Sequence, residues 1–172
     1  STTDKKLIAL VGNPNVGKSV FFHYLSKVYV DVSNYPGTTV EITSATFGDE
    51  SENTLIQDTP GIYGVSSFND EEKVARDIIL YSDIVLNIAS ATSLDRDLFL
   101  TKQLTDMGKS LVLVINQMDE AKAIGLEIDT KKLSKLLGIP VLTTTAIAGE
   151  GMKEVKDAIY PISTSTAKKG ST

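Results

Sequence analysis

The stretch of sequence that decides the fold is Gly12-Asn13-Pro14-Asn15-Val16-Gly17-Lys18-Ser19. It fits the spacing G-x-x-x-x-G-K-[ST], and it lies between an apolar run and a segment with helical spacing, which is the context that this motif requires. Glycines let the backbone approach phosphate oxygens, and the loop amides and the helix start supply positive potential. We expect Lys18 to reach the terminal phosphates of a nucleotide and the Ser19 hydroxyl to bind Mg²⁺.

Apolar runs rich in β-branched residues alternate with helical segments on both sides of this loop. The expected strands are residues 7–11, 40–47, 54–57, 84–89, 111–115 and 141–144, and the expected helices are 18–27, 70–80, 94–107, 130–137 and 152–159. Residues 48–53 are too few for a crossover helix, so strands 40–47 and 54–57 must form a hairpin. The sequence predicts an α/β fold with a six-stranded mixed sheet, one antiparallel edge strand, and helices on both faces.

Composition limits the class of protein. A length of 172 residues with 41% hydrophobic residues predicts one domain, residues 1–162, followed by a polar tail, 163–172, that is flexible or starts a linker to missing parts. The absence of cysteine excludes disulfides and thiolate chemistry. No apolar run approaches the roughly 20 residues of a membrane helix. A net charge of −5 argues against nucleic acid as a partner.

A second motif follows the strand at 54–57 and reads Asp58-Thr59-Pro60-Gly61. An acidic residue at a strand end helps to hold Mg²⁺ in P-loop hydrolases. Alone, the same residues describe an ordinary turn in which Asp accepts backbone hydrogen bonds. The phosphate loop upstream favours the magnesium interpretation.

A third motif follows the buried run 111–115 and reads Asn116-Gln117-Met118-Asp119. The carboxylate of Asp119 can accept hydrogen bonds from guanine N1–H and its exocyclic amine, a donor pair that adenine lacks. We expect Asp119 to select guanine and Asn116 to brace the loop. Helix capping would explain Asp119 alone, but not an Asn three residues earlier. After the last strand, we expect backbone amides to approach the guanine carbonyl from Thr145, Ala146 and Ile147.

In order, these loops resemble the nucleotide-contacting loops of the Ras-like GTPase superfamily. Residues 34–41, 58–64, 72–77 and 87–98 further resemble the cytosolic G domain of FeoB, the bacterial ferrous-iron transporter. The resemblance implies a cytoplasmic domain of an inner-membrane protein, tethered to the pore of the same transporter. GTP binding and hydrolysis would then regulate or drive Fe²⁺ transport. The resemblance leaves the oligomeric state open, and a homo-oligomer is one option.

The family pattern also implies that the loop 28–39 is a nucleotide-sensitive switch, in which Thr39 binds Mg²⁺ when the γ-phosphate is present. Thr38 is the competing candidate, and the spacing to the residues that follow favours Thr39. The nucleotide-contacting residues implied here are Gly37, Thr38, Thr39, Val40 and Glu41.

Ile62 occupies the position at which Ras and Gα carry the Gln that orients the attacking water. Water must therefore be positioned by other groups, and we name no general base. Members with a hydrophobic residue here resemble potassium-activated GTPases, which implies that Asn15 helps to bind K⁺ beside the β- and γ-phosphates. Asn15 as a residue that merely holds the turn is the alternative. The expected catalytic residues are Asn15, Lys18 and Thr39.

Gln117 replaces the Lys of the common N-K-x-D motif, whose stem packs over the purine. A shorter neutral side chain should hold the base less firmly. We therefore expect micromolar affinity for nucleotide and GDP release without an exchange factor. Two other functions stay open: a non-hydrolysing GTP/GDP switch module, which Ile62 favours, and a ribosome- or RNA-associated GTPase, which the acidic charge disfavours.

Overall fold

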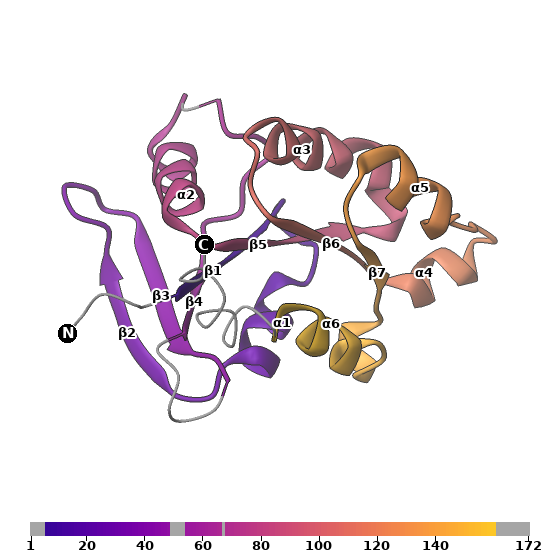
Figure 1. Ribbon diagram of the computed structural model, residues 1–172, viewed down its shortest axis with the longest axis horizontal. Helices are drawn as coiled ribbons and strands as arrows, with labels where there is room; N and C mark the ends of the chain where they lie inside the picture. Colours follow the sequence, from indigo (N-terminus) through magenta and orange to yellow (C-terminus); the bar gives the residue numbers. More distant parts are fainter. Residues whose placement is uncertain (1–5, 49–53, 67, 161–172) are drawn as a thin grey trace, which may run out of the picture.

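The computed structural model describes residues 6–48, 54–66 and 68–160. A single twisted sheet lies between two layers of helices (Figure 1). The elements in chain order are β1 (Lys6–Gly12), α1 (Lys18–Leu25), β2 (Tyr29–Asn34), β3 (Glu41–Thr46), β4 (Thr54–Asp58), α2 (Asp70–Tyr81), β5 (Ile84–Ser90), the 3₁₀ turn η1 (Ala91–Ser93), α3 (Leu94–Asp106), β6 (Leu111–Asn116), α4 (Met118–Ala123), α5 (Thr130–Leu137), β7 (Val141–Thr143), the 3₁₀ turn η2 (Ala146–Ala148) and α6 (Met152–Ile159).

The strands of the sheet lie in the order β2-β3-β4-β1-β5-β6-β7. The pairs from β4 to β7 are parallel, whereas β3 runs antiparallel to both β4 and β2. The expected hairpin between the strands around 40–47 and 54–57 is therefore confirmed. Its turn at 49–53, like the tail 163–172, lies outside the described residues, and the expected domain boundary stays a prediction.

Alternating side chains of each central strand pack on opposite faces of the sheet. In β6, Val112 and Val114 face a core that also holds Phe21 of α1 and Val155 of α6. Leu113, which lies between them, faces the other side, where α2, α3 and α5 cover the sheet, as Figure 1 shows. Burial on both faces explains the continuous apolar run of this strand.

The prediction of six strands was wrong by one, because residues 29–34 form the edge strand β2. All six of its side chains are exposed, so it lacks the buried apolar run that marks the central strands. Pairing with β3 through backbone hydrogen bonds holds it in place. Part of the expected switch loop 28–39 is thus a strand, and the antiparallel strand at 41–46 is not the edge. A short helix, α4, was also not expected.

The carboxyl ends of β1, β4, β5, β6 and β7 meet at one edge of the sheet, where ligands of open α/β sheets bind.

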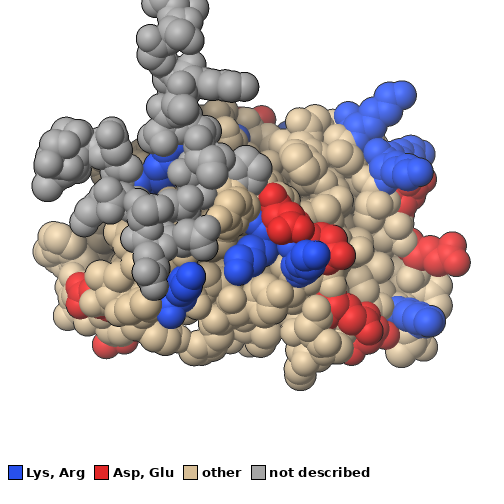
Figure 2. Space-filling model, turned by 60° about the horizontal axis from the view of Figure 1, so that its bottom comes forward, with Lys and Arg blue, Asp and Glu red and all other residues tan. Residues whose placement is uncertain are grey.

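None of the helices in the described residues is long and apolar enough to cross a lipid bilayer. On the side where α1 and α6 lie, Figure 2 shows Lys and Arg interspersed with Asp and Glu.

Candidate nucleotide-binding site

The phosphate loop turns sharply between β1 and α1. Gly17 has a φ of 85°, and a Cβ on it would lie 2.5 Å from Nδ2 of Asn116. Only glycine therefore fits there without displacing the Asn116 side chain. Asn15 also adopts a left-handed conformation, with φ at 70°, which asparagine tolerates better than most residues. Both residues turn the backbone around the start of α1.

The ammonium group of Lys18 lies at the end of β4. It donates to the carboxylate of Asp58 and to the backbone carbonyl of Thr59, and its side chain is largely buried. Thr59 is fixed in turn, since its hydroxyl donates to the carbonyl of Leu10 at 2.8 Å. The expected phosphate lysine and the expected magnesium aspartate are therefore neighbours.

A hollow of about 590 Å³ opens over these groups. Its walls are the loop from Asn13 to Ser19 together with Asp58, Gly61 and Gln117. The Ser19 hydroxyl and the Asp58 carboxylate are hard oxygen donors, the type that Mg²⁺ prefers, so this lining fits the ion. Gly61 packs closely on the loop, because a Cβ there would lie 3.1 Å from Cγ of Pro14.

Asn116, at the end of β6, connects two loops. Its Nδ2 donates to the backbone carbonyl of Val16 at 3.0 Å, and its Oδ1 accepts from the Thr144 hydroxyl at 3.0 Å and from the backbone N–H of Ala146 at 2.9 Å. The side chain is only 3% exposed. A buried amide with these partners fixes the phosphate loop relative to the loop after β7.

Gln117, the next residue, also reaches the phosphate loop. Its Nε2 donates to the backbone carbonyl of Asn15 at 3.4 Å, and its Oε1 accepts from the hydroxyl of Ser90. Its φ of 64° directs the chain into α4. Ser90 was not among the residues that sequence reasoning selected, and a serine at a strand end carries no signal of such a contact.

A second hollow, of about 700 Å³, lies beyond Gln117 and is lined by Met118, Asp119, Lys122 and Thr145, among others. Asp119 is exposed on α4, so its carboxylate is available to a ligand. Ala146 is buried, whereas the Ile147 side chain is 86% exposed. Of the residues that sequence reasoning assigned to the nucleotide site, Met118, Asp119 and Thr145 thus line this hollow.

The loop with Gly37 and Thr39 does not line either hollow. Thr38 is occupied within its own turn, because its hydroxyl donates to the carbonyl of Tyr35 at 2.9 Å and accepts from the N–H of Val40 at 3.1 Å. Thr39 is exposed. Of the two threonines, Thr39 therefore has the free side chain. Glu41 begins β3 and pairs with Asn34 of β2.

Tyr35 holds this loop against α2. Its hydroxyl donates to Asp77 at 3.3 Å, and its backbone N–H donates to the carbonyl of Val40 at 2.8 Å. Burial raises the pKa of the Tyr35 hydroxyl above its ordinary value of 10.0, and the negative charge of Asp77 adds to the rise.

The Ile62 side chain points into the core between the sheet and α2, with 2% of its surface exposed. Its backbone N–H donates to the carbonyl of Gly12 at 3.1 Å, so the loop after Asp58 is tied to the phosphate loop by its backbone. An aliphatic side chain turned into the core cannot position water in the hollow.

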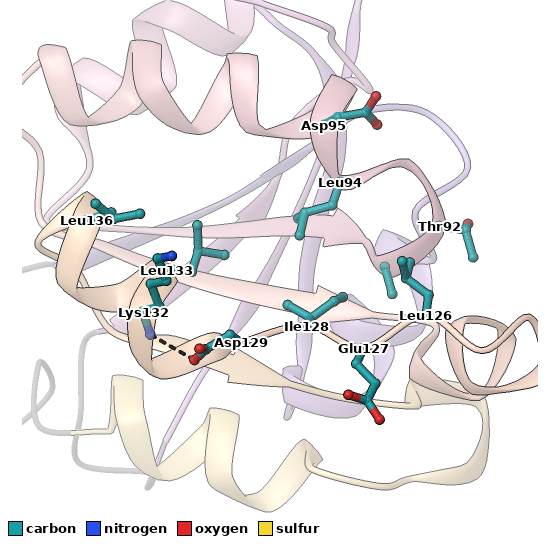
Figure 3. A pocket seen from close by; sticks show the side chains of 11 residues that line it. Thr92, Leu94, Asp95, Leu126, Glu127, Ile128, Asp129, Lys132, Leu133 and Leu136 are labelled. Carbon is teal, nitrogen blue, oxygen red and sulfur yellow. Dashed lines mark hydrogen bonds between the residues drawn. The ribbon is translucent and has the colours of Figure 1, made fainter.

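An apolar hollow of about 440 Å³ lies elsewhere, between η1 and α5. Figure 3 shows Leu94, Ile128 and Leu133 lining it. At its rim the backbone N–H of Lys132 donates to Asp129, the N-cap of α5, at 3.0 Å. An aliphatic lining suits neither phosphate nor the polar edge of a base, and we assign it no part in the nucleotide site.

The sheet order and the loops at its carboxyl edge define a Ras-like G domain of the P-loop GTPase class. Within this class the chain belongs to the family described as Ferrous iron transport protein B, whose sequence profile matches residues 6–159. The family resemblance seen in the sequence is thereby confirmed.

Relatives and solved structures agree with this assignment. The Fe(2+) transporter FeoB of Helicobacter pylori strain J99 is 39% identical over 146 residues, which is 84% of this chain. A GDP-bound mutant of S. thermophilus NFeoB superposes with a TM-score of 0.84 at 39% identity, covering 94% of this chain and 64% of that one. The FeoB G-domain of Methanococcus jannaschii gives 0.73 at 37% identity, covering 94% of this chain and 99% of that one.

The chain spans 23% of the H. pylori transporter, and 19% of a Porphyromonas gingivalis fusion protein of Fe(2+) transport protein A and FeoB, to which it is 37% identical.

Proposed function

We propose that this chain binds GTP and GDP with Mg²⁺ and hydrolyses GTP slowly, as the G domain of a bacterial ferrous-iron transporter. The observation that carries the proposal is the pair of amide contacts from the β6 loop to the phosphate loop, Asn116 to Val16 and Gln117 to Asn15. These contacts make one site from a loop suited to phosphates and a loop suited to guanine.

Nucleotide binding would begin with an exchange of partners at Lys18. In the structure its ammonium group is held by Asp58 and Thr59. When GTP binds, the ammonium group would donate to its terminal phosphates instead, since they are stronger acceptors than a backbone carbonyl. Asp58 would then be released to act with the Ser19 hydroxyl as an Mg²⁺ ligand. The ion would supply charge neutralisation at the phosphate oxygens.

Base selection would rest on Asp119. Its exposed carboxylate on α4 can accept from the two donors on the guanine edge. Of the three backbone amides expected at the guanine carbonyl, those of Thr145 and Ala146 already donate to Glu150 and Asn116, so the amide of Ile147 would face the carbonyl. The GDP and GMPPNP forms in which the cytosolic domain of T. maritima FeoB was solved support a guanine site of this kind.

Hydrolysis would proceed without a glutamine, because Ile62 is buried in the core. We infer that backbone groups of the loops at 37–39 and 59–61 position the water, with Thr39 moving toward the phosphates. A K⁺ ion held by Asn15 would supply positive charge between the β- and γ-phosphates. Asn15 is exposed at the hollow, and its side-chain oxygen is a suitable ligand for such an ion.

The buried Ile62 also favours a second function, a GTP/GDP switch that signals by conformation without turnover. In either case the partner would be the membrane pore of the same transporter, which places this domain in the cytoplasm. The similarity to the cytosolic domain of L. pneumophila FeoB supports that location.

Phosphate release from GTP, measured in KCl and in NaCl at equal ionic strength, tests the proposal. We expect K⁺ to raise the rate many-fold and Asn15→Ala to abolish the gain. Lys131→Ala, which removes an exposed lysine of α5, should keep it. Negligible turnover in both salts, with nucleotide still bound, would favour the switch module.

A further inference from the structure

Helix α3 carries a buried carboxylate, Asp97, that belongs to no nucleotide-binding motif. It is 2% exposed. Its Oδ2 accepts from the backbone N–H of Ser90 at 2.8 Å and from the hydroxyl of Ser93 at 3.1 Å, and its Oδ1 accepts from Nε of Arg96 at 3.3 Å. A buried carboxylate is costly unless its oxygens are paired, so these contacts fix the first turn of α3 against the end of β5.

The shortest contact of Asp97 is with the phosphate loop. Nδ2 of Asn13 donates to Oδ1 of Asp97 at 2.5 Å, between residues 84 positions apart. Asn13 is 2% exposed, and its Oδ1 is buried without a partner among the described residues. One charge-assisted hydrogen bond therefore sets the orientation of the Asn13 side chain.

A second route runs from Asp97 to the same loop. Asp97 holds the backbone of Ser90, whose hydroxyl donates to Gln117. Gln117 in turn donates to the carbonyl of Asn15. The carboxylate is thus connected to the first asparagine of the phosphate loop directly, and to the second through the guanine loop.

We propose that Asp97 is a positioning residue for nucleotide binding, which holds the phosphate loop and the guanine loop in one arrangement before the nucleotide arrives. Its side chain need not touch the nucleotide, because it acts through Asn13 and Ser90. A loop that is already ordered loses less conformational entropy on binding, so Asp97 strengthens the affinity. This inference rests on the proposed function.

The direct test measures release of the fluorescent nucleotide mant-GDP by stopped flow, with urea unfolding of each variant to establish that it is folded. Asp97→Ala should release mant-GDP roughly tenfold to a hundredfold faster, as expected when a charge-assisted hydrogen bond is lost. Asp95→Ala removes an exposed carboxylate two positions away on the same helix, and should leave the rate unchanged.

An exchange of the side chains of Asn13 and Asp97 distinguishes a positioning role from a merely structural one. Asn13→Asp alone would place two carboxylates face to face and weaken binding of mant-GDP. Adding Asp97→Asn restores a carboxylate–amide pair, and should recover roughly tenfold of the lost affinity. This test remains available if Asp97→Ala does not fold.

Two results would overturn the inference: mant-GDP release from folded Asp97→Ala at the wild-type rate, or an exchanged pair that binds no better than Asn13→Asp. Failure of the wild-type protein to bind mant-GDP would instead remove the proposed function itself. The two failures are therefore distinguishable.

Discussion

Asn116 donates its side-chain amide to the backbone carbonyl of Val16 at 3.0 Å, across 100 residues of sequence. The same side chain accepts from Thr144 and Ala146. One buried residue thus holds the phosphate loop, the end of β6 and the loop after β7 at fixed separations. The geometry of the site depends on this contact before any nucleotide binds.

Replacement of Asn116 by alanine should destabilise the fold as well as weaken binding. It leaves the Val16 carbonyl and the Ala146 N–H without this partner, and each unpaired buried group costs about 1–3 kcal/mol. We expect the free energy of unfolding in urea to fall by about 2–6 kcal/mol for the two groups together. Asn34→Ala, at an exposed site, should cost far less. Equal losses in the two variants would show that Asn116 does not brace the loops.

The affinity for GDP should be micromolar, with release that needs no exchange factor. In the structure Gln117 donates to the backbone carbonyl of Asn15. Its side chain is nevertheless shorter than that of a lysine and carries no charge. We expect Gln117→Lys to slow the release of mant-GDP in stopped flow. Wild-type release that takes minutes or longer, or a lysine variant that releases just as fast, would contradict this explanation.

Asp119→Asn should change the base that the site accepts. A side-chain amide can donate to the additional carbonyl of xanthine, but it no longer offers two acceptors to the donors of guanine. We expect GDP affinity to fall by about a hundredfold or more, and XDP to bind better than GDP. Competition against mant-GDP measures both. Unchanged GDP affinity would show that the base does not bind against Asp119.

The stability of the protein should depend on Tyr35 at alkaline pH. Because the pKa of Tyr35 is raised in the folded state, the fold favours the protonated hydroxyl. Its contribution is complete below the ordinary value near 10.0 and is lost as the pH rises through the folded pKa. Above pH 10.0, the unfolding free energy of the wild-type protein should fall more steeply than that of Tyr35→Phe. Parallel curves would contradict the assignment.

The central strands and the phosphate loop were predictable because each follows a local sequence pattern. Continuous apolar runs mark strands buried on both faces, and glycines mark the turn at Gly17. The edge strand β2 was missed because it has no buried apolar run, although Tyr29, Val30 and Val32 are residue types that strands favour. Its place is set by pairing with β3, a tertiary contact.

Asp97 could have been found from the spacing of α3, and was not. It lies on the same face as Leu100, Thr101 and Leu104, all of them buried. A carboxylate in such a stripe requires partners, which indicates a role. The identity of those partners, Asn13 and Ser90, depends on the packing of distant segments and could not be read from the sequence.

Titration calorimetry of the protein with GDP and with ADP, in the presence of Mg²⁺, tests the central claim most directly. A single guanine-selective site at the carboxyl edge of the sheet predicts micromolar binding of GDP and no measurable heat with ADP. Ser19→Ala should weaken GDP binding only when Mg²⁺ is present. Equal affinity for the two nucleotides, or no binding of either, would contradict the account.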